Sequence, residues 1–360
     1  MIFDHAASCL LPLLLVAFLV IHDDSESNKL KAEAPANDPA TDVWSEWLLR
    51  RRHGGDPNHE PVIRGMVHQI RDRVLDGARL SAGMVLVDVG SGDGLIPFGA
   101  FARVGPSLKA VLTDVSAPLL KRAEEGALER GIRDHCTFLQ TSAERLDGVA
   151  DASADVLTTR AVLAYIVDKA AAARQFYRVL KPGGRISIGE PICRYEALKL
   201  AALTEFLRSR PADAVSAHAQ LRHRCRAAQL PSTLEEIQNN TLTNFSEREL
   251  ISIFEKAGFP EAHLELHIDI RKAAAVPWDT YIDTAPRPGV PTLREIMASH
   301  LSASEQRQFE EDLRPLVESG RNMERDTIAY LTAVKPGEQI RRSVEPQDAD
   351  ECSGKREFSR

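Results

Sequence analysis

The sequence predicts an α/β fold built on a mostly parallel sheet, and three observations support this prediction. An apolar run at residues 85–89 leads directly into a loop with glycines at alternate positions, Gly90, Gly92 and Gly94. Short apolar segments then alternate with helical ones, which is the pattern of parallel strands joined by crossover helices. The 360 residues are 43% hydrophobic and 27% charged, a composition that allows a large buried core.

Seven segments have the length and apolar character of strands. They are residues 85–89, 108–113, 135–140, 155–160, 185–189, 264–270 and 327–334. A helical apolar period over residues 61–80 should lead into the first strand. Before the fifth strand, Pro182 is expected to stop a helix, and Gly183 and Gly184 are expected to give its left-handed exit.

Two stretches interrupt the alternation and predict helical insertions. The first, at about residues 191–245, is too long for a simple connection and follows the fifth strand, where such folds bind their substrates. Ser246 and Glu249 then form a capping box that opens a helix ending at Gly258. The second insertion, at about residues 273–324, begins with a proline-rich loop and is expected to continue as two amphipathic helices. We therefore expect one domain over residues 42–336.

The two ends of the chain differ from this domain. Residues 6–21 are uncharged and apolar, but a spanning helix needs about 20 such residues. Asp4 and His5 stand where a secretory signal has its basic region, and no small-residue cleavage site follows the segment, so it is a poor secretory signal. We expect an apolar segment and disordered linker at residues 1–41 and a disordered tail at 337–360. Membrane contact through residues 6–21 and an unstructured start are the alternatives, and both leave a cytoplasmic domain.

The glycine loop also indicates the kind of ligand. A dinucleotide loop of the GxGxxG type needs a third glycine, and here the corresponding positions are Leu95 and Pro97. The sequence instead places Asp88 two residues before Gly90, at the carboxyl end of the first strand. Because a carboxylate there would repel a pyrophosphate, a positively charged ligand without phosphate fits better.

This arrangement of an acid and glycines resembles the first motif of the class I S-adenosylmethionine-dependent methyltransferases. Asp114 follows the second strand, where a carboxylate can hold both ribose hydroxyls, and residues 142–144 follow the third strand, where that family places its adenine-contacting loop. The turn at residues 180–184, Leu-Lys-Pro-Gly-Gly, is typical of the family. The resemblance implies a Rossmann-like seven-stranded sheet, with S-adenosyl-L-methionine as cofactor.

The resemblance also implies which residues hold the cofactor. They come from the carboxyl ends of the first four strands. Asp88, Gly90, Ser91, Gly92 and Asp93 are expected around the methionine and sulfonium groups, Asp114 at the ribose, Val115, Ala143 and Glu144 at the adenine, and Arg160 at the methionine side.

The acceptor is less well defined, because methyl transfer from a sulfonium depends on positioning more than on a covalent catalyst. Residues 159–162 lack the Pro-Pro loop of nucleobase amine methyltransferases, and a net charge of −7 disfavours nucleic acid. We expect a small organic acceptor methylated on O, N or C, as in quinone-biosynthesis and natural-product relatives. No catalytic residue is assigned. Candidates for a base or an acceptor contact are His53, His59, Tyr165, Glu190, His223 and Tyr281.

Two alternatives remain open. One is a cofactor-binding regulatory or assembly protein without turnover. The other is an arsenite-type methyltransferase that uses Cys193 and Cys225, although a convincing third thiol is missing. The five cysteines lack metal-ligand spacing, so we expect no metal site and a reducing cytosol.

Two aromatic and basic features lie near the start of the expected domain. Trp44 and Trp47, three residues apart, predict a short helix packed on the domain, with a substrate lid as the alternative. The cluster at residues 50–52, Arg-Arg-Arg, is expected to be a solvated helix face.

The Asp114→Ala variant tests the ribose assignment. It should fold normally and bind S-adenosylmethionine roughly tenfold more weakly or worse, because the carboxylate that accepts the ribose hydroxyl hydrogen bonds is gone. Calorimetric titration measures the affinity, and an unchanged affinity would refute the assignment.

Overall fold

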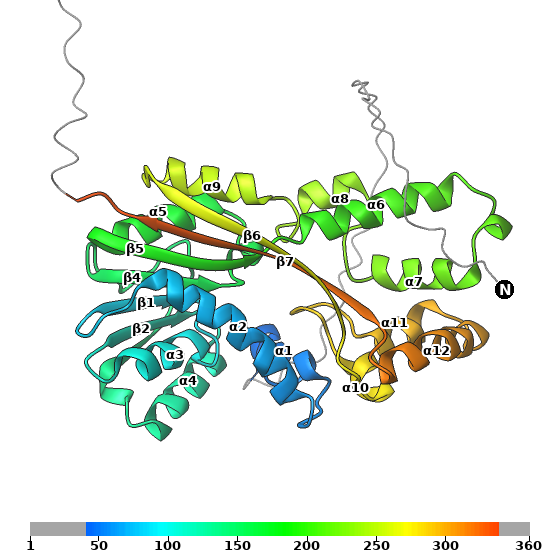
Figure 1. Ribbon diagram of the computed structural model, residues 1–360, viewed down its shortest axis with the longest axis horizontal. Coiled ribbons are helices and arrows are strands. Elements are labelled where there is room, and N and C mark those ends of the chain that lie inside the picture. The colour runs from blue at the N-terminus through cyan, green and yellow to red at the C-terminus, as the bar shows by residue number, and fades with distance from the viewer. Residues whose placement is uncertain (1–40, 338–360) are drawn as a thin grey trace, which may run out of the picture. The chain divides into compact units, whose positions relative to one another are not determined.

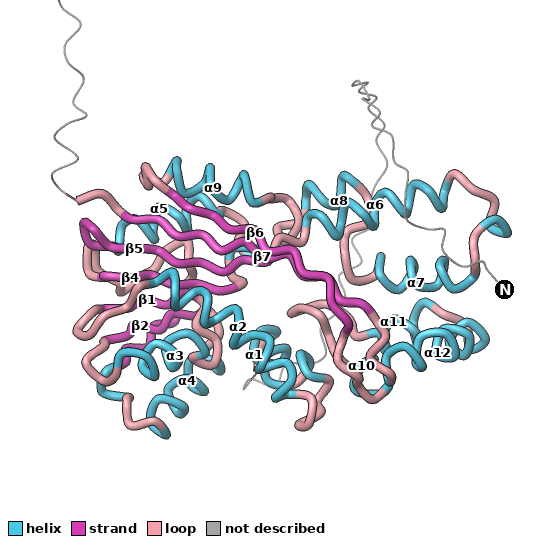
Figure 2. The backbone as a smooth tube through the Cα atoms, viewed as in Figure 1, coloured by secondary structure: helices cyan, strands magenta, loops and turns pink. Residues whose placement is uncertain are grey.

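The computed structural model describes residues 41–337 and confirms the predicted fold class. Its centre is a seven-stranded sheet with the order β3-β2-β1-β4-β5-β7-β6 (Figures 1 and 2). The strands are β1 Val85–Val89, β2 Lys109–Asp114, β3 Cys136–Gln140, β4 Ala154–Arg160, β5 Leu180–Pro191, β6 Ala262–Lys272 and β7 Met323–Val334. Strands β1 to β5 pair in parallel, whereas β7 is antiparallel to both β5 and β6.

Helices cover both faces of this sheet, because alternate residues of its strands point to opposite faces. Leu86 belongs to a buried cluster with residues of three helices, α2 Glu60–Ala78, α3 Leu95–Val104 and α4 Ala117–Glu129. Its neighbour Val87 belongs to the cluster on the other face, with α5 Lys169–Val179 and α9 Glu247–Lys256. The Ser246 and Glu249 capping box of α9 is confirmed.

The two insertions are helical, and the second holds three helices where two were expected. The first contains α6 Arg194–Arg208, α7 Ala217–Ala227 and α8 Leu234–Asn239, and the second α10 Trp278–Asp283, α11 Leu293–His300 and α12 Ala303–Glu318. Helix α10 has only six residues, too few to show a helical period in the sequence. Residues of α7, α10, α11 and α12 share a separate buried cluster around Trp278 and Phe309.

The second insertion is carried by a hairpin. Strand β5 pairs with β7 from Val334 to Ile328, and beyond that point β6 and β7 continue alone as far as the Lys272–Met323 pair. This two-stranded ribbon, which Figure 2 shows running out of the sheet, leads to the helices of the second insertion. Because β5 and β6 have the same direction, both insertions leave the sheet at the carboxyl ends of its parallel strands.

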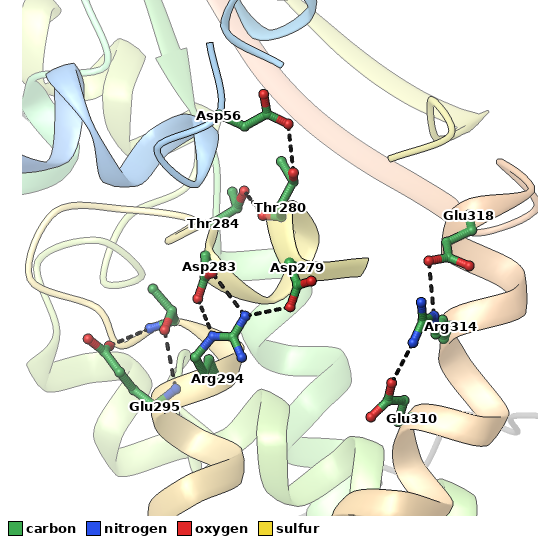
Figure 3. Close-up of polar contacts among 11 residues, drawn as sticks. Asp56, Asp279, Thr280, Asp283, Thr284, Arg294, Glu295, Glu310, Arg314 and Glu318 are labelled. Atoms are coloured by element: carbon green, nitrogen blue, oxygen red, sulfur yellow. Dashed lines mark hydrogen bonds and ion pairs between the residues drawn. The ribbon is translucent and has the colours of Figure 1, made fainter. Parts of the chain in front are cut away.

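The segment before the first strand is tied to the second insertion. Helix α1 Val43–Leu49 is followed by a 3-10 turn, η1 Arg51–His53, and by a loop that leads into α2. In that loop the Asp56 carboxylate accepts a 2.7 Å hydrogen bond from the Thr280 hydroxyl of α10 (Figure 3).

Three further 3-10 turns complete the elements of the described chain: η2 Arg133–His135, η3 Leu163–Tyr165 and η4 Ala212–Ala214.

Two local expectations were wrong. Helix α5 already ends at Val179, and Gly183, with φ of 81°, forms a turn inside the long β5, where its N–H donates to the Lys335 carbonyl. Gly184 does not have positive φ. Between β3 and β4 the chain forms turns, not a crossover helix, and fully buried Leu146 anchors them in the core.

The terminal predictions fall mostly outside the described residues. This holds for the apolar segment at 6–21, the linker and nearly all of the tail, so the predicted domain limits, the membrane contact and the cytoplasmic location stay predictions. Within residues 41–337, no helix combines the length and the apolar character needed to cross a membrane.

A pair of glycines in α2 tests how closely this helix packs on the sheet. A Cβ at Gly77 would lie 2.5 Å from the Ser187 hydroxyl and 2.7 Å from the Thr332 methyl, whereas one at Gly65 would meet nothing within 4 Å. Gly77→Ala should lower the free energy of unfolding by roughly 1–3 kcal/mol. Gly65→Ala should raise it by about 0.5–1 kcal/mol, because alanine favours a helix. Urea denaturation measures both, and equal effects would contradict the packing.

Candidate cofactor and acceptor site

The glycine loop after β1 adopts the backbone conformation that its sequence predicts. Gly90, Gly92 and Gly94 have φ values of 68°, 55° and 88°, which glycine adopts without strain. The N–H groups of Gly90 and Ser91 donate to the Thr113 carbonyl at 2.8 and 2.9 Å. A Cβ on Gly90 would overlap the side chain of Val162. The loop is therefore fixed to the end of β2 and packed under the loop that follows β4.

Asp88 lies beneath this loop. Its side chain is 1% exposed and accepts a 2.6 Å hydrogen bond from the Thr158 hydroxyl. Burial raises the pKa of Asp88 to about 7. The Ser91 hydroxyl donates to the Asp88 carbonyl at 2.9 Å. Buried and hydrogen-bonded in this way, Asp88 supports the glycine loop from inside the fold. Thr158 is a polar residue inside an apolar strand, and its position there could have indicated a buried polar partner such as Asp88.

Asp114 joins the end of β2 to the glycine loop. One of its carboxylate oxygens accepts a hydrogen bond from Gly92 N–H at 2.8 Å, and the other accepts one from Ser116 N–H at 2.9 Å. Burial raises the pKa of Asp114. Each carboxylate oxygen can accept a second hydrogen bond, so the group can also hold hydroxyls.

The expected adenine-contacting residues lie at the ends of β2 and β3. Val115 is 48% exposed, and its carbonyl accepts a hydrogen bond from the Gln140 amide. Ala143 is buried in the core. The Glu144 carboxylate accepts a 3.3 Å hydrogen bond from Asp168 N–H and so links the loops after β3 and β4.

Arg160 ends β4 without a direct partner. Within the described residues its guanidinium has neither a hydrogen bond nor an ion pair, although Asp93, Glu190 and Asp88 lie close enough to affect its pKa. Burial is the main influence and lowers that pKa. A shielded cation without a contacting carboxylate is costly, so Arg160 is available to an anionic group of a ligand.

A second shielded arginine lies beside the first. Arg52 is 9% exposed, and its Nε is one of the few buried polar atoms without a partner in the described chain. Its guanidinium lies 5.8 Å from the centroid of the Trp47 ring. The expectation of a solvated face was thus wrong for Arg52, because the 3-10 turn directs this side chain inward. Burial lowers its pKa, and Asp93 and Arg160 are the nearest charges.

Arg64 completes this group of cations around the glycine loop. It pairs with Glu60 and lies 3.8 Å from Asp93. Together with Arg52 and Arg160, three guanidinium groups thus share two carboxylates outside the core, those of Asp93 and Glu60. The surplus positive charge suits a carboxylate ligand.

Helix α1 covers the loop and connects it with the second insertion. The Leu48 side chain lies 3.4 Å from where a Cβ on Gly92 would be. Trp44 packs edge-on against Tyr165, with ring centroids 5.1 Å apart, and Trp47 Nε1 donates to the Ala285 carbonyl at 2.9 Å. The predicted short helix is confirmed, and its two tryptophans face different parts of the site.

Glu190 ends the buried part of β5. It is fully buried and accepts hydrogen bonds from Ala164 N–H at 2.8 Å and Val162 N–H at 3.2 Å. Burial raises its pKa to about 7. These bonds hold the loop after β4, in which Ala161 has a left-handed φ of 55°, a strained value of the kind found at functional sites.

The other candidates for a base divide into two groups. His53 is buried beside Arg52, its Nδ1 has no partner among the described residues, and burial lowers its pKa; burial also lowers the pKa of nearby His59. His223 is hydrogen-bonded to the Thr204 hydroxyl at 2.8 Å, and Tyr281 stacks on Trp278. These last two therefore have structural contacts within the insertions.

The cysteines give no support to the arsenite alternative. Cys193 packs against the core cluster of α5 and α9, whereas Cys225 is buried in the cluster of the insertions. Burial raises the pKa of both thiols, that of Cys225 to about 11. Over residues 41–337, no group of three or more His, Cys, Asp or Glu side chains could hold a metal.

Two cavities lie elsewhere in the domain. One, of about 350 Å³, lies between α2 and the strands β5 to β7 and is lined by Arg73 and Tyr330. The other, of about 460 Å³, lies among α10, α11 and α12. Neither includes a residue of the glycine loop, whose chemistry identifies the site better than cavity size does.

Comparison with known proteins agrees with this geometry. A family model described as a methyltransferase domain matches residues 80–258. The ubiquinone/menaquinone biosynthesis C-methyltransferase of Hahella chejuensis is 34% identical over 125 residues, which is 34% of this chain and 50% of that protein. The Pseudomonas putida enzyme of the same name is 32% identical over 158 residues, 43% of this chain and 57% of that protein. The chain thus spans about half the length of the curated relatives it matches.

A solved structure completes these comparisons. The YcgJ protein from Bacillus subtilis aligns over 75% of this chain and 99% of its own, with 18% identity and a TM-score of 0.44. Together with the family match, the strand order and the acid-glycine loop identify a protein with a methyltransferase domain. The domain matched at residues 80–258 belongs to the class I S-adenosylmethionine-dependent methyltransferase family.

The raised pKa of Glu190 predicts a pH-dependent contribution to stability. A carboxyl group with a raised pKa binds its proton more tightly in the folded state, so its contribution falls as the pH rises from its ordinary value of 4.5 through about 7. Glutamine cannot ionise. Glu190→Gln should therefore gain stability relative to the parent between about pH 5 and pH 8.

Denaturation of both proteins at several pH values measures this difference. Glutamine loses one hydrogen bond to the loop after β4, which lowers the stability of the variant by the same amount at every pH. This loss does not change how the stability difference varies with pH. A stability difference that stays constant over the range would show that Glu190 is already ionised at the lower pH.

Proposed function

We propose that the protein is a methyltransferase that transfers a methyl group from S-adenosylmethionine to O, N or C of a small organic acceptor. The observation that carries the proposal is the arrangement at the carboxyl edge of the sheet. There a glycine loop fixed to β2, the Asp114 carboxylate and Arg160, which has no partner among residues 41–337, lie on adjacent strands. S-adenosylmethionine has a carboxylate, a sulfonium and a ribose to match such groups.

The proposed contacts follow from this arrangement. Arg160, with Arg52 beside it, binds the methionine carboxylate through charge-assisted hydrogen bonds. Asp114 binds the ribose hydroxyls. The adenine lies against Val115, Ala143 and Glu144. The sulfonium side of the cofactor lies near the residues at the end of the first strand and in the glycine loop, which are Asp88, Gly90, Ser91, Gly92 and Asp93.

A dinucleotide is a weaker candidate for this site. Asp88 and Asp114 flank the glycine loop with two acids, and Asp93 adds a third inside it. Helix α3 begins directly after the loop at Leu95, so a pyrophosphate at its N-terminus would lie beside the Asp93 carboxylate.

The acceptor is expected to approach from the side of the insertions. Methyl transfer is an in-line displacement in which the acceptor atom attacks opposite the sulfur, and much of the catalysis comes from positioning and exclusion of water. The relatives are named as ubiquinone/menaquinone biosynthesis C-methyltransferases, which supports carbon as one possible acceptor atom. The family match ends at residue 258, before the second insertion, so the acceptor itself must be identified from this chain.

Titration of the full-length protein tests the cofactor. S-adenosylmethionine and S-adenosylhomocysteine should bind with dissociation constants in the micromolar range, about −8 kcal/mol, while NAD gives no heat. Binding of NAD alone would indicate a dehydrogenase. Binding without methyl transfer to any of a broad panel of small acceptors would favour a regulatory role.

A variant of Arg160 tests its role separately from the rest of the site. Arg160→Met should weaken S-adenosylhomocysteine roughly tenfold or more, because it removes the partner of the methionine carboxylate. Methylthioadenosine, which lacks that carboxylate, should bind both proteins equally. Arg103→Met is a matched control, because Arg103 pairs with Asp76 on the surface of α2. An equal loss for both ligands would show a general structural effect.

A further inference from the structure

The second insertion places another shielded arginine beside the site. Arg287 lies in the loop between α10 and α11, between Pro286 and Pro288, which restrict the backbone on both sides of it. Its guanidinium donates a hydrogen bond to the Gln229 carbonyl. It has no ion pair with a carboxylate of residues 41–337.

The charges around Arg287 do not compensate it. The titratable groups close enough to affect its pKa are the Cys193 thiol, the Tyr165 phenol and another cation, Arg226. Burial is the main influence on Arg287 and lowers its pKa. A single hydrogen bond to a carbonyl leaves most of its N–H groups free. Shielding such a cation from water is unfavourable unless an anion meets it.

The loop that carries Arg287 is held against the site from two directions. Ala285 N–H donates to the Arg51 carbonyl at 2.8 Å, and the Trp47 indole donates to the Ala285 carbonyl at 2.9 Å. The Gln229 amide, from the first insertion, donates to the Pro291 carbonyl at 3.0 Å. The loop is thus fixed to the segment that covers the glycine loop and to the other insertion.

Tyr165 lies near both Arg287 and the residues of the cofactor site. Its phenol lies close enough to Arg287, Arg160 and Glu190 for each to affect its pKa. The Trp44 ring packs on Tyr165. Glu190 is the acid that affects the pKa of Tyr165, and backbone N–H groups already bind its carboxylate. The aromatic pair Trp44 and Tyr165 therefore lies close to two cations, of which Arg160 is assigned to the cofactor.

We infer that the acceptor is an oxyanion with an apolar body, and that Arg287 binds its charged group. This inference rests on the proposed methyl transfer. A planar guanidinium with free N–H groups can hold a carboxylate or a phosphate ester through two parallel hydrogen bonds. Trp44 and Tyr165 suit an aromatic or other flat apolar body.

The test uses the full-length protein with saturating S-adenosylhomocysteine and three probes of similar size. Benzoate, phenyl phosphate and the neutral benzamide are titrated at constant ionic strength, and binding is measured by calorimetry. At least one of the two anions should bind roughly tenfold more tightly than benzamide. The stronger anion identifies the oxyanion as carboxylate or phosphate.

Arg287→Met should reduce binding of that anion to the level of benzamide, and Arg287→Lys should give an intermediate loss, because lysine keeps the charge but not the planar fork. Neither variant should change the affinity for S-adenosylhomocysteine by more than about twofold. Arg294→Met is the control: Arg294 lies in the same insertion but is exposed and already paired with Asp279 and Asp283 (Figure 3).

The outcomes separate the two proposals. Failure of S-adenosylhomocysteine to bind the parent protein would overturn the proposed function. Normal cofactor binding with no preference for either anion, or with none of the three probes bound, would overturn the inference about the acceptor alone. A preference for the anion that survives in both Arg287 variants would overturn it as well. Because Arg287→Lys retains a long cationic side chain, it keeps the test valid if the methionine variant does not fold.

Discussion

The site depends on one constraint: the backbone between β1 and α3 must stay within hydrogen-bonding distance of the end of β2. Two N–H groups of the loop reach the Thr113 carbonyl, and a third reaches Asp114. These bonds need left-handed φ at the glycines and leave no room for a side chain at Gly90, where Val162 packs. The same contact positions the loop after β4, so three strand ends are fixed together before any ligand binds.

Buried charge accompanies this rigid edge. Asp88 near the end of β1 and Glu190 near the end of β5 have raised pKa values, and each accepts hydrogen bonds from within the fold. The arginines differ, because Arg160 lacks a partner in the described chain and Arg52 leaves its Nε unbonded. The acids are thus hydrogen-bonded within the fold, while the arginines beside them keep free N–H groups. This arrangement favours an anionic ligand group over a free cation. The cost in stability is of the kind that functional sites carry.

The sequence predicted the central fold well because the signals there are local. Apolar runs and a glycine pattern specify strands and a turn, and the seven strands appear within a few residues of their expected limits. The sequence located both insertions but did not predict every helix in them, since α10 is too short to show a helical period. The burial of Arg52 and the position of Arg287 depend on contacts between segments more than 200 residues apart, such as Trp47 with Ala285. No local pattern carries that information, although two prolines around Arg287 indicated a restricted backbone there.

The way the second insertion joins the sheet has a consequence for how such a protein can change over evolution. The insertion leaves β6 and returns to β7 at two neighbouring points, where Ala273 N–H donates to the Asn322 carbonyl at 2.8 Å. A segment whose two ends meet in this way can be lengthened, shortened or replaced without altering strand pairing. Acceptor choice can then diverge by exchange of a single continuous stretch of the gene, while the cofactor half of the protein stays unchanged.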